Sequence, residues 1–112
     1  MAIEPTLAQF FGANATQTET QLIITKADLV DDRVPPRFLF TPSATDTAEK
    51  LFTGILMKVA LGQDTSVDSQ LAVASGGLSL VTVSDKLYRQ YLFTLRLLIS
   101  AEDARFPDPD KL

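Results

Sequence analysis

The residues of this chain that could transfer protons or hold a ligand are carboxylates, lysines, arginines, serines and two tyrosines, because the chain contains neither histidine nor cysteine. Without those two residue types there is no Ser-His or Cys-His nucleophile pair, and the usual zinc ligands and disulfides are absent as well. We therefore expect no metal and no cofactor. Catalysis is disfavoured but not excluded, since carboxylates and tyrosines can still act as acids or bases.

One group of polar and aromatic residues could line a ligand pocket. Arg89, Tyr91 and Arg96 lie close together in the sequence, and one of the chain's carboxylates could join them. A pocket of this kind needs a concave surface on which the polar groups converge. The group supports one function hypothesis, a small-molecule binding module or a carboxylate-dependent enzyme. The sequence alone does not bring these residues together.

An acidic cluster lies in the middle of the chain, next to two arginines. Asp28, Asp31 and Asp32 could suggest a cation site, but their spacing lacks the glycine and the final glutamate of an EF-hand loop. We expect a solvated acidic turn instead. Arg33 and Arg37 are available there as ion-pair partners on the surface, where such pairs add little stability.

The composition narrows the classes of partner. A net charge of −4 argues against a surface that follows nucleic-acid phosphates, which needs clustered lysine and arginine. Hydrophobic residues make up 46% of the chain; this is rich for a small domain and would fit an oligomer interface. No apolar run is long enough to cross a membrane, and the N-terminus has no signal-peptide pattern. We expect a cytoplasmic protein with no nucleic-acid or membrane partner.

The candidate residues above must be positioned by helices and strands. The sequence predicts that these elements form a single α+β domain over residues 1–106. An acidic, proline-containing tail follows over residues 107–112, where the prolines oppose regular structure. The predicted architecture is a short N-terminal helix, one strand and one long amphipathic helix packed on an antiparallel sheet. A C-terminal meander of three strands completes that sheet.

The N-terminal half predicts a helix and then a strand. Residues 4–11 are typical of a short helix, with Pro5 at its first position and Gly12 at its end. Residues 19–26 are typical of a strand. The apolar residues at its centre would lie on both faces, so we expect it to be covered on both sides. They are Leu22, Ile23 and Ile24.

Residues 45–61 form the clearest helical pattern in the chain. Asp46 and Glu49 have the spacing of a capping box, and Asp46 and Lys50 are an i,i+4 ion pair. Gly54 lowers the helix propensity of the interior, and one explanation is close contact with the sheet. We expect this helix to cover the sheet.

The C-terminal meander rests on a glycine pair. Gly76 and Gly77 can both adopt the positive φ of a two-residue type I′ turn, and a second turn would lie at residues 84–86. Residues 87–99 fit a strand better than a helix, because a helix leaves large apolar side chains off its stripe. The first hairpin would have one bulky face, composed of Leu71, Val73, Leu78 and Leu80.

The second function hypothesis is a non-catalytic structural or interaction protein that acts as a homo-oligomer. It rests on the high apolar content, the poor catalytic chemistry and the open sheet edge that invites pairing with another chain. The partner would be a second copy or an unidentified protein. The candidate interface residues are Arg37, Phe38, Phe40, Leu92 and Leu98.

Overall fold

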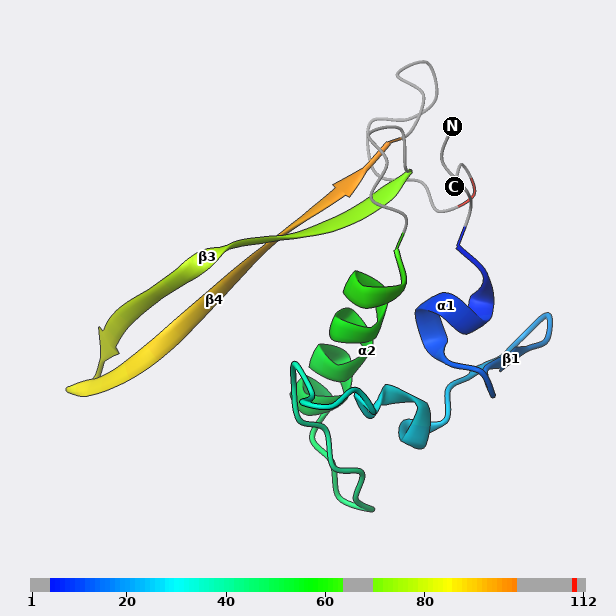
Figure 1. Cartoon of the computed structure of the whole chain (residues 1–112), viewed down its shortest axis with the longest axis horizontal. Coiled ribbons are helices and arrows are strands. Elements are labelled where there is room, and N and C mark those ends of the chain that lie inside the picture. The colour runs from blue at the N-terminus through cyan, green and yellow to red at the C-terminus, as the bar shows by residue number, and fades with distance from the viewer. Residues whose placement is uncertain (1–4, 64–69, 99–109, 111–112) are drawn as a thin grey trace. The chain divides into compact units, whose positions relative to one another are not determined.

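The computed structural model describes residues 5–63, residues 70–98 and Asp110. The chain divides into two compact units, Ile3–Asp64 and Thr65–Leu112, the second of which also includes Met1–Ala2. We call them the helical unit and the hairpin unit after their main elements (Figure 1).

The described residues confirm the α+β class. They form a long helix, a short helix and two antiparallel sheets of two strands each. The single domain predicted over residues 1–106 stays a prediction. The predicted tail at residues 107–112 lies outside the described residues except for Asp110.

The short helix α1, Leu7–Phe11, begins after a complete capping box. The Thr6 hydroxyl accepts the backbone N–H of Gln9 (3.2 Å), and the Gln9 side chain accepts the backbone N–H of Thr6 (2.7 Å). Pro5 therefore precedes the cap and is not the first helical residue, which corrects the predicted start. Gly12 ends the helix as predicted, with a φ of 107°.

The strands β1, Thr16–Gln17, and β2, Leu22–Ile23, pair with each other as a small antiparallel hairpin. Leu22 and Ile23 are 50% and 52% exposed, so the prediction of a strand covered on both faces over residues 19–26 is wrong. The Thr18 hydroxyl accepts the backbone N–H of Gln21 and helps to turn the chain. This turn directs the apolar pair into a short exposed hairpin instead of a central strand.

The long helix α2, Ala48–Gly62, packs against α1 and against the 3₁₀ helix η1, Lys26–Leu29. Thr47 caps α2, because its hydroxyl accepts the backbone N–H of Lys50 (3.1 Å). The prediction of Asp46 as the cap is therefore wrong by one residue. The Asp46 carboxylate is occupied by other donors, which are described below.

The core of the helical unit lies where Phe40 meets the middle of α2. Phe40 and Leu29 are 6% and 2% exposed. A Cβ placed on Gly54 would meet the Phe40 ring at 2.8 Å and the Leu29 side chain at 3.5 Å. The close approach inferred at Gly54 is therefore made by Phe40 and not by the sheet. The expected packing of α2 across the C-terminal sheet concerns both units and stays a prediction.

The hairpin unit consists of β3, Leu71–Val83, and β4, Lys86–Leu97, in one antiparallel pair. The strands are joined at Ser84 and Asp85, which have φ values of 51° and 65°, as a two-residue type I′ turn requires. The strand prediction for residues 87–99 is confirmed as far as β4 extends.

The glycine pair forms a β-bulge and not the predicted turn. The register shifts between Ser75 and Gly77, and Gly77 has a φ of 117°, a conformation that side chains disfavour. The two strands predicted on either side of the pair are thus one continuous strand. The three-strand meander is wrong for the described residues, because the glycines bend the strand instead of reversing it.

The bulge gives the hairpin one apolar face. The extra residue at Gly76 and Gly77 reverses the alternation of side chains, so Leu78 stays on the same face as Val73. Val73 and Leu80 both pair with β4, Val73 with Leu95 and Leu80 with Arg89. The apolar side chains on this face are Leu71, Val73, Leu78 and Leu80 of β3 and Leu87, Tyr91, Phe93, Leu95 and Leu97 of β4.

We expect Gly54→Ala to lower the free energy of unfolding by about 1–3 kcal/mol, because the added methyl group overpacks against the Phe40 ring. This loss should exceed the gain of about 1 kcal/mol in helix propensity. Denaturant unfolding measures the change, and Thr53→Ala on the exposed side of α2 is the control. The penalty of Gly54→Ala should shrink in a Phe40→Leu background. Equal penalties in both backgrounds would contradict the contact.

Candidate functional site

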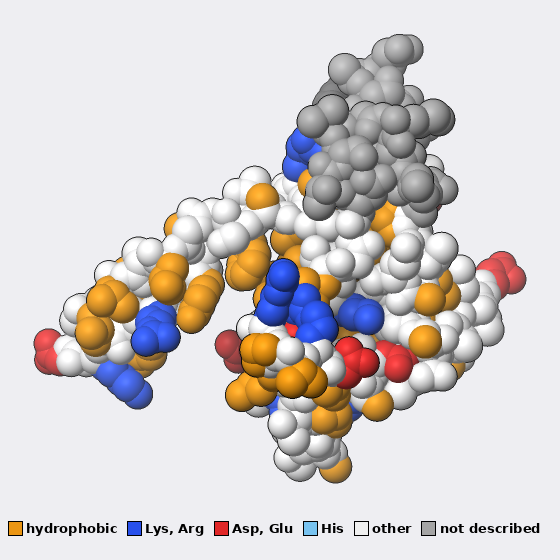
Figure 2. All heavy atoms as spheres, in the orientation of Figure 1, with side chains coloured by type: hydrophobic (Ala, Val, Ile, Leu, Met, Phe, Trp, Pro, Cys, Tyr) orange, Lys and Arg blue, Asp and Glu red, His pale blue; other side chains and the backbone are white. Residues whose placement is uncertain are grey.

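The apolar face of the hairpin is widely exposed. Val73 is covered, with 6% of its surface exposed, but six other large residues of the face are between 39% and 63% exposed. They are Leu78, Leu80, Leu87, Tyr91, Phe93 and Leu95. Figure 2 shows hydrophobic side chains along the length of the hairpin. The sequence analysis placed Leu78 and Leu80 correctly on one face with Val73.

The hairpin does not bring the proposed ligand-binding residues together on one face. Arg89 and Tyr91 lie on the apolar face, whereas Arg96 lies on the opposite one, because side chains alternate along β4. All three are exposed. The two tyrosines of β4 are also on different faces, because Tyr88 lies on the face that carries Arg96.

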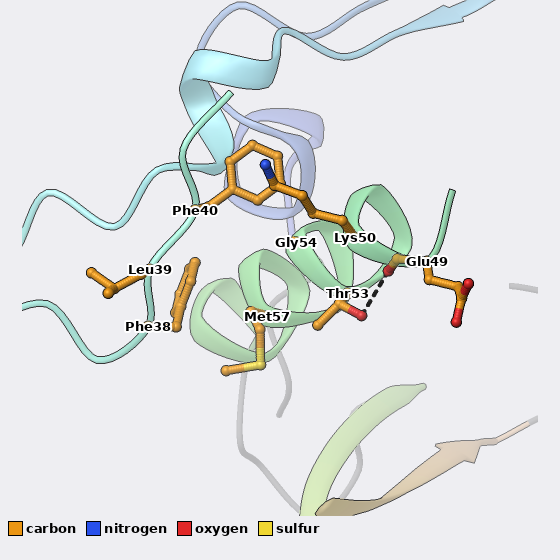
Figure 3. A pocket seen from close by; sticks show the side chains of 8 residues that line it. All are labelled: Phe38, Leu39, Phe40, Glu49, Lys50, Thr53, Gly54 and Met57. Atoms are coloured by element: carbon orange, nitrogen blue, oxygen red, sulfur yellow. Dashed lines mark hydrogen bonds between the residues drawn. The ribbon is translucent and has the colours of Figure 1, made fainter. Parts of the chain in front are cut away.

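The helical unit has a shallow groove between residues 38–40 and α2 (Figure 3). Its volume is about 280 Å³, slightly below the roughly 300–1,000 Å³ typical of ligand pockets. Phe38 and Phe40 line one side, and Gly54 and Met57 of α2 line the other. This is an apolar hollow of the size of one or two side chains.

The polar groups around the groove are bonded within the chain. The Thr53 hydroxyl donates to the backbone carbonyl of Glu49 (2.8 Å). The Lys50 ammonium group donates to the Thr41 carbonyl (2.6 Å) and lies 5.2 Å from the centroid of the Phe40 ring. The groove therefore offers apolar contact and no set of convergent polar groups for catalysis.

The candidate interface residues of the helical unit differ in accessibility. Arg37 is exposed, Phe38 is half-buried and Phe40 is buried in the core. Leu39, which belongs to the same candidate segment, is 88% exposed. The position of Leu39 between two phenylalanines could have indicated its exposure, because the neighbouring rings are half-buried or buried.

The candidate interface residues of the hairpin unit are both exposed. Leu92 is part of β4, on the face opposite the apolar face, and Leu98 follows the strand. The backbone N–H of Leu98 donates to the Gln70 carbonyl (2.7 Å) and continues the ladder. Sequence reasoning thus selected the less apolar face of the hairpin. The sequence feature that would have drawn attention to β3 is its lack of any charged residue.

The acidic cluster is divided between different partners. The Arg33 guanidinium group donates twice to Asp31, from Nε (2.8 Å) and Nη2 (2.7 Å). The sequence predicts this pair, but on the surface, whereas the Asp31 side chain is 3% exposed; the solvated acidic turn is therefore wrong for Asp31. Arg37 donates its backbone N–H to the same carboxylate. Asp28 instead accepts two hydrogen bonds from Asn14. No group of three metal-binding side chains occurs among the residues that the structure describes.

The Asp31 carboxylate is unsuited to acid–base catalysis. Its hydrogen bonds with Arg33 hold its pKa well below the usual range for aspartate, and the backbone N–H groups of Arg37 and Arg33 lower it further. The same contact raises the pKa of Arg33. The pair therefore stays charged at neutral pH, and a carboxylate held ionised in this way is a weak base for proton transfer.

Asp46 joins three segments of the helical unit. Its carboxylate is 1% exposed and accepts the ammonium groups of Lys50 (2.6 Å) and Lys26 (3.2 Å). It also accepts the backbone N–H (3.0 Å) and the hydroxyl (3.1 Å) of Ser43. The hydrogen bonds from Lys50 and Ser43 hold the pKa of Asp46 well below its ordinary value. The i,i+4 pair predicted from the sequence is confirmed as part of this structural cluster.

Comparison with known proteins returned no match to a family model, a curated protein or a solved structure. Among the described residues, no helix has the length and apolar character needed to cross a membrane.

We expect Asp46→Asn to lower the free energy of unfolding at pH 7. The free energy of unfolding of the variant should also change less with pH than that of the wild type. Asp46 has a depressed pKa in the folded state, so its contribution is complete above the pKa of the unfolded chain, about 4. The contribution is lost as the pH falls towards the lower folded-state pKa. Unfolding by denaturant at several pH values between about 3 and 7 measures this loss.

Glu49→Gln is the control for this experiment, because it removes one exposed carboxylate from the first turn of the same helix. Its stability curve should keep the shape of the wild-type curve. An Asp46→Asn curve parallel to that of the wild type would show that the cluster adds no pH-dependent stability.

Proposed function

We propose that this protein is a non-catalytic structural or interaction protein that works as a homo-oligomer. The exposed apolar face of the hairpin is the observation that carries the proposal. The proposal includes the cytoplasmic location expected from the sequence.

The size of the apolar face supports an interface. Aromatic side chains bury about 150–250 Å² each and leucines are smaller, so two aromatic residues and four leucines at roughly half exposure leave on the order of 500 Å² uncovered. The largest apolar patch on a typical monomer is about 300–600 Å², and a standard interface buries roughly 800 Å² on each partner. The face is therefore at the upper end for a monomer and supplies most of the area that an interface needs.

The two-stranded form of the hairpin is a second argument for self-association. Among the described residues, β3 and β4 pair only with each other. Such a hairpin is at best marginally stable in water, and further strands or another layer are needed to stabilise it. A second copy of the chain supplies both an apolar face and strands of matching length.

The alternative, a small-molecule binding module or a carboxylate-dependent enzyme, has less support. Arg89 and Arg96 lie on opposite faces of β4. The buried carboxylates of Asp31 and Asp46 are each paired with basic side chains of the same chain. Both functions of this class need polar groups that converge in a pocket.

We expect Leu95→Asp to shift the mass in solution from an oligomer towards the 12.2 kDa of a single chain. The new carboxylate lies opposite Val73 on the apolar face, so on association it would have to be buried without a partner. Light scattering after size exclusion, over a range of concentrations, measures the mass.

Thr94→Asp is the matched control, because it adds the same charge one residue earlier, on the opposite face of β4. It should leave the oligomer intact. Leu78→Asp tests the face from β3, in case Leu95→Asp unfolds the hairpin, and Leu98→Asp tests whether the interface extends beyond the strand. A wild-type chain that is monomeric at every concentration would refute the proposal.

A further inference from the structure

One edge of the hairpin carries no charge. β3 contains no Asp, Glu, Lys, Arg or Pro along its 13 residues, whereas β4 carries Lys86, Arg89 and Arg96. Natural proteins protect exposed edge strands from pairing with other chains by charges, especially lysine, and by proline. By this criterion the edge of β4 is protected and the edge of β3 is not.

Residues 78–83 form the part of β3 between the bulge and the turn. In the described part of the chain the sheet order is β3-β4, so the side of this segment that faces away from β4 has no strand beside it. The bulge at Gly76 and Gly77 bends β3. It thereby separates residues 78–83 from the earlier half of the strand.

We propose that two copies of the chain pair antiparallel through residues 78–83 of β3, which joins the two hairpins into one four-stranded sheet. This inference rests on the proposed function, because it names the contact by which the homo-oligomer forms. The strand order across the joined sheet is β4, β3, β3 of the partner and β4 of the partner. Four strands exceed the three that a sheet needs for independent stability.

Two hairpins can join through two β3 strands, through two β4 strands, or through one β3 and one β4 strand. The charges of the hairpin favour the pairing of two β3 strands. An antiparallel pair of β4 strands would place the cations Lys86, Arg89 and Arg96 of both copies on one ladder, and like charges close together destabilise a sheet. A pair of β3 with β4 leaves one edge of each hairpin open, so it adds copies until a ring closes. Pairing of β3 with β3 opposes no charges and ends at two copies.

The geometry of the joined sheet also fits the apolar face. The two-fold axis of an antiparallel strand pair is perpendicular to the sheet, so the apolar faces of both hairpins point to the same side. The joined sheet therefore offers twice the apolar surface of one hairpin for burial against another layer. Edge pairing and face burial use different groups and are compatible.

The symmetry makes a specific prediction for crosslinking. Residues directly opposite each other lie on the same face, so in a symmetric pair of β3 strands one residue lies opposite its own copy. A single cysteine at that residue brings two thiols within reach of a disulfide. The chain contains no cysteine, so each introduced thiol is the only one in the molecule.

The experiment uses single-cysteine variants of the full-length chain under mild oxidation. The β3 set is Ser79→Cys, Leu80→Cys, Val81→Cys and Thr82→Cys. The matched β4 set replaces their ladder partners, Gln90, Arg89, Tyr88 and Leu87, which lie at the same heights on the other strand. Non-reducing gels measure the covalent dimer, at twice 12.2 kDa, and the same reaction in urea measures the background from random collisions.

We expect one position of the β3 set to crosslink well above the urea background, and no position of the β4 set to do so. The mass of the unmodified chain is measured alongside and tests the proposed function separately. An oligomer whose β3 variants do not crosslink, or whose β4 variants crosslink as strongly, would overturn edge pairing and leave the proposed function standing. A strict monomer would overturn both.

Discussion

The helical unit depends on the contact between the Phe40 ring and the backbone of α2 at Gly54. A ring can lie this close to a helix only where no Cβ intervenes, and Gly54 provides that place. Phe40 then closes the core with Leu29, and Lys50 lies over the outer side of the ring. The shallow groove beside α2 is a consequence of this contact, because it fixes residues 38–40 along the helix.

The hairpin unit depends on a different constraint, the phase of side-chain alternation along β3. A strand of 13 residues without a bulge would place Leu78 and Leu80 on the face opposite Val73. The extra residue at Gly76 and Gly77 returns them to the same face. The result is a hairpin with one largely apolar face, interrupted by Arg89, which is unfavourable in water unless another layer covers it.

The buried carboxylates of the helical unit hold segments of the chain together. Asp46 ties η1, the loop before α2 and α2 itself together through Lys26, Ser43 and Lys50. Asp31 fixes the following loop through Arg33. The acceptor positions of both carboxylates are occupied by donors from the same chain, and no substrate is needed to satisfy them. This distribution of polar contacts is why the function that we propose is assembly through the exposed apolar surface.

The sequence by itself determined the features that depend on neighbouring residues. The α+β class, the end of α1 at Gly12, the strand after residue 86 and the pair of Asp46 with Lys50 follow from local periodicity and from spacing within one helical turn. Only the tertiary structure decided whether the glycine pair reverses the chain in a turn or bends it in a bulge. A positive φ is compatible with both, and the choice depends on how the strands pair over many residues. The tertiary structure also decided that Phe40 meets Gly54 and that the apolar face is exposed, since burial depends on which distant segments come together.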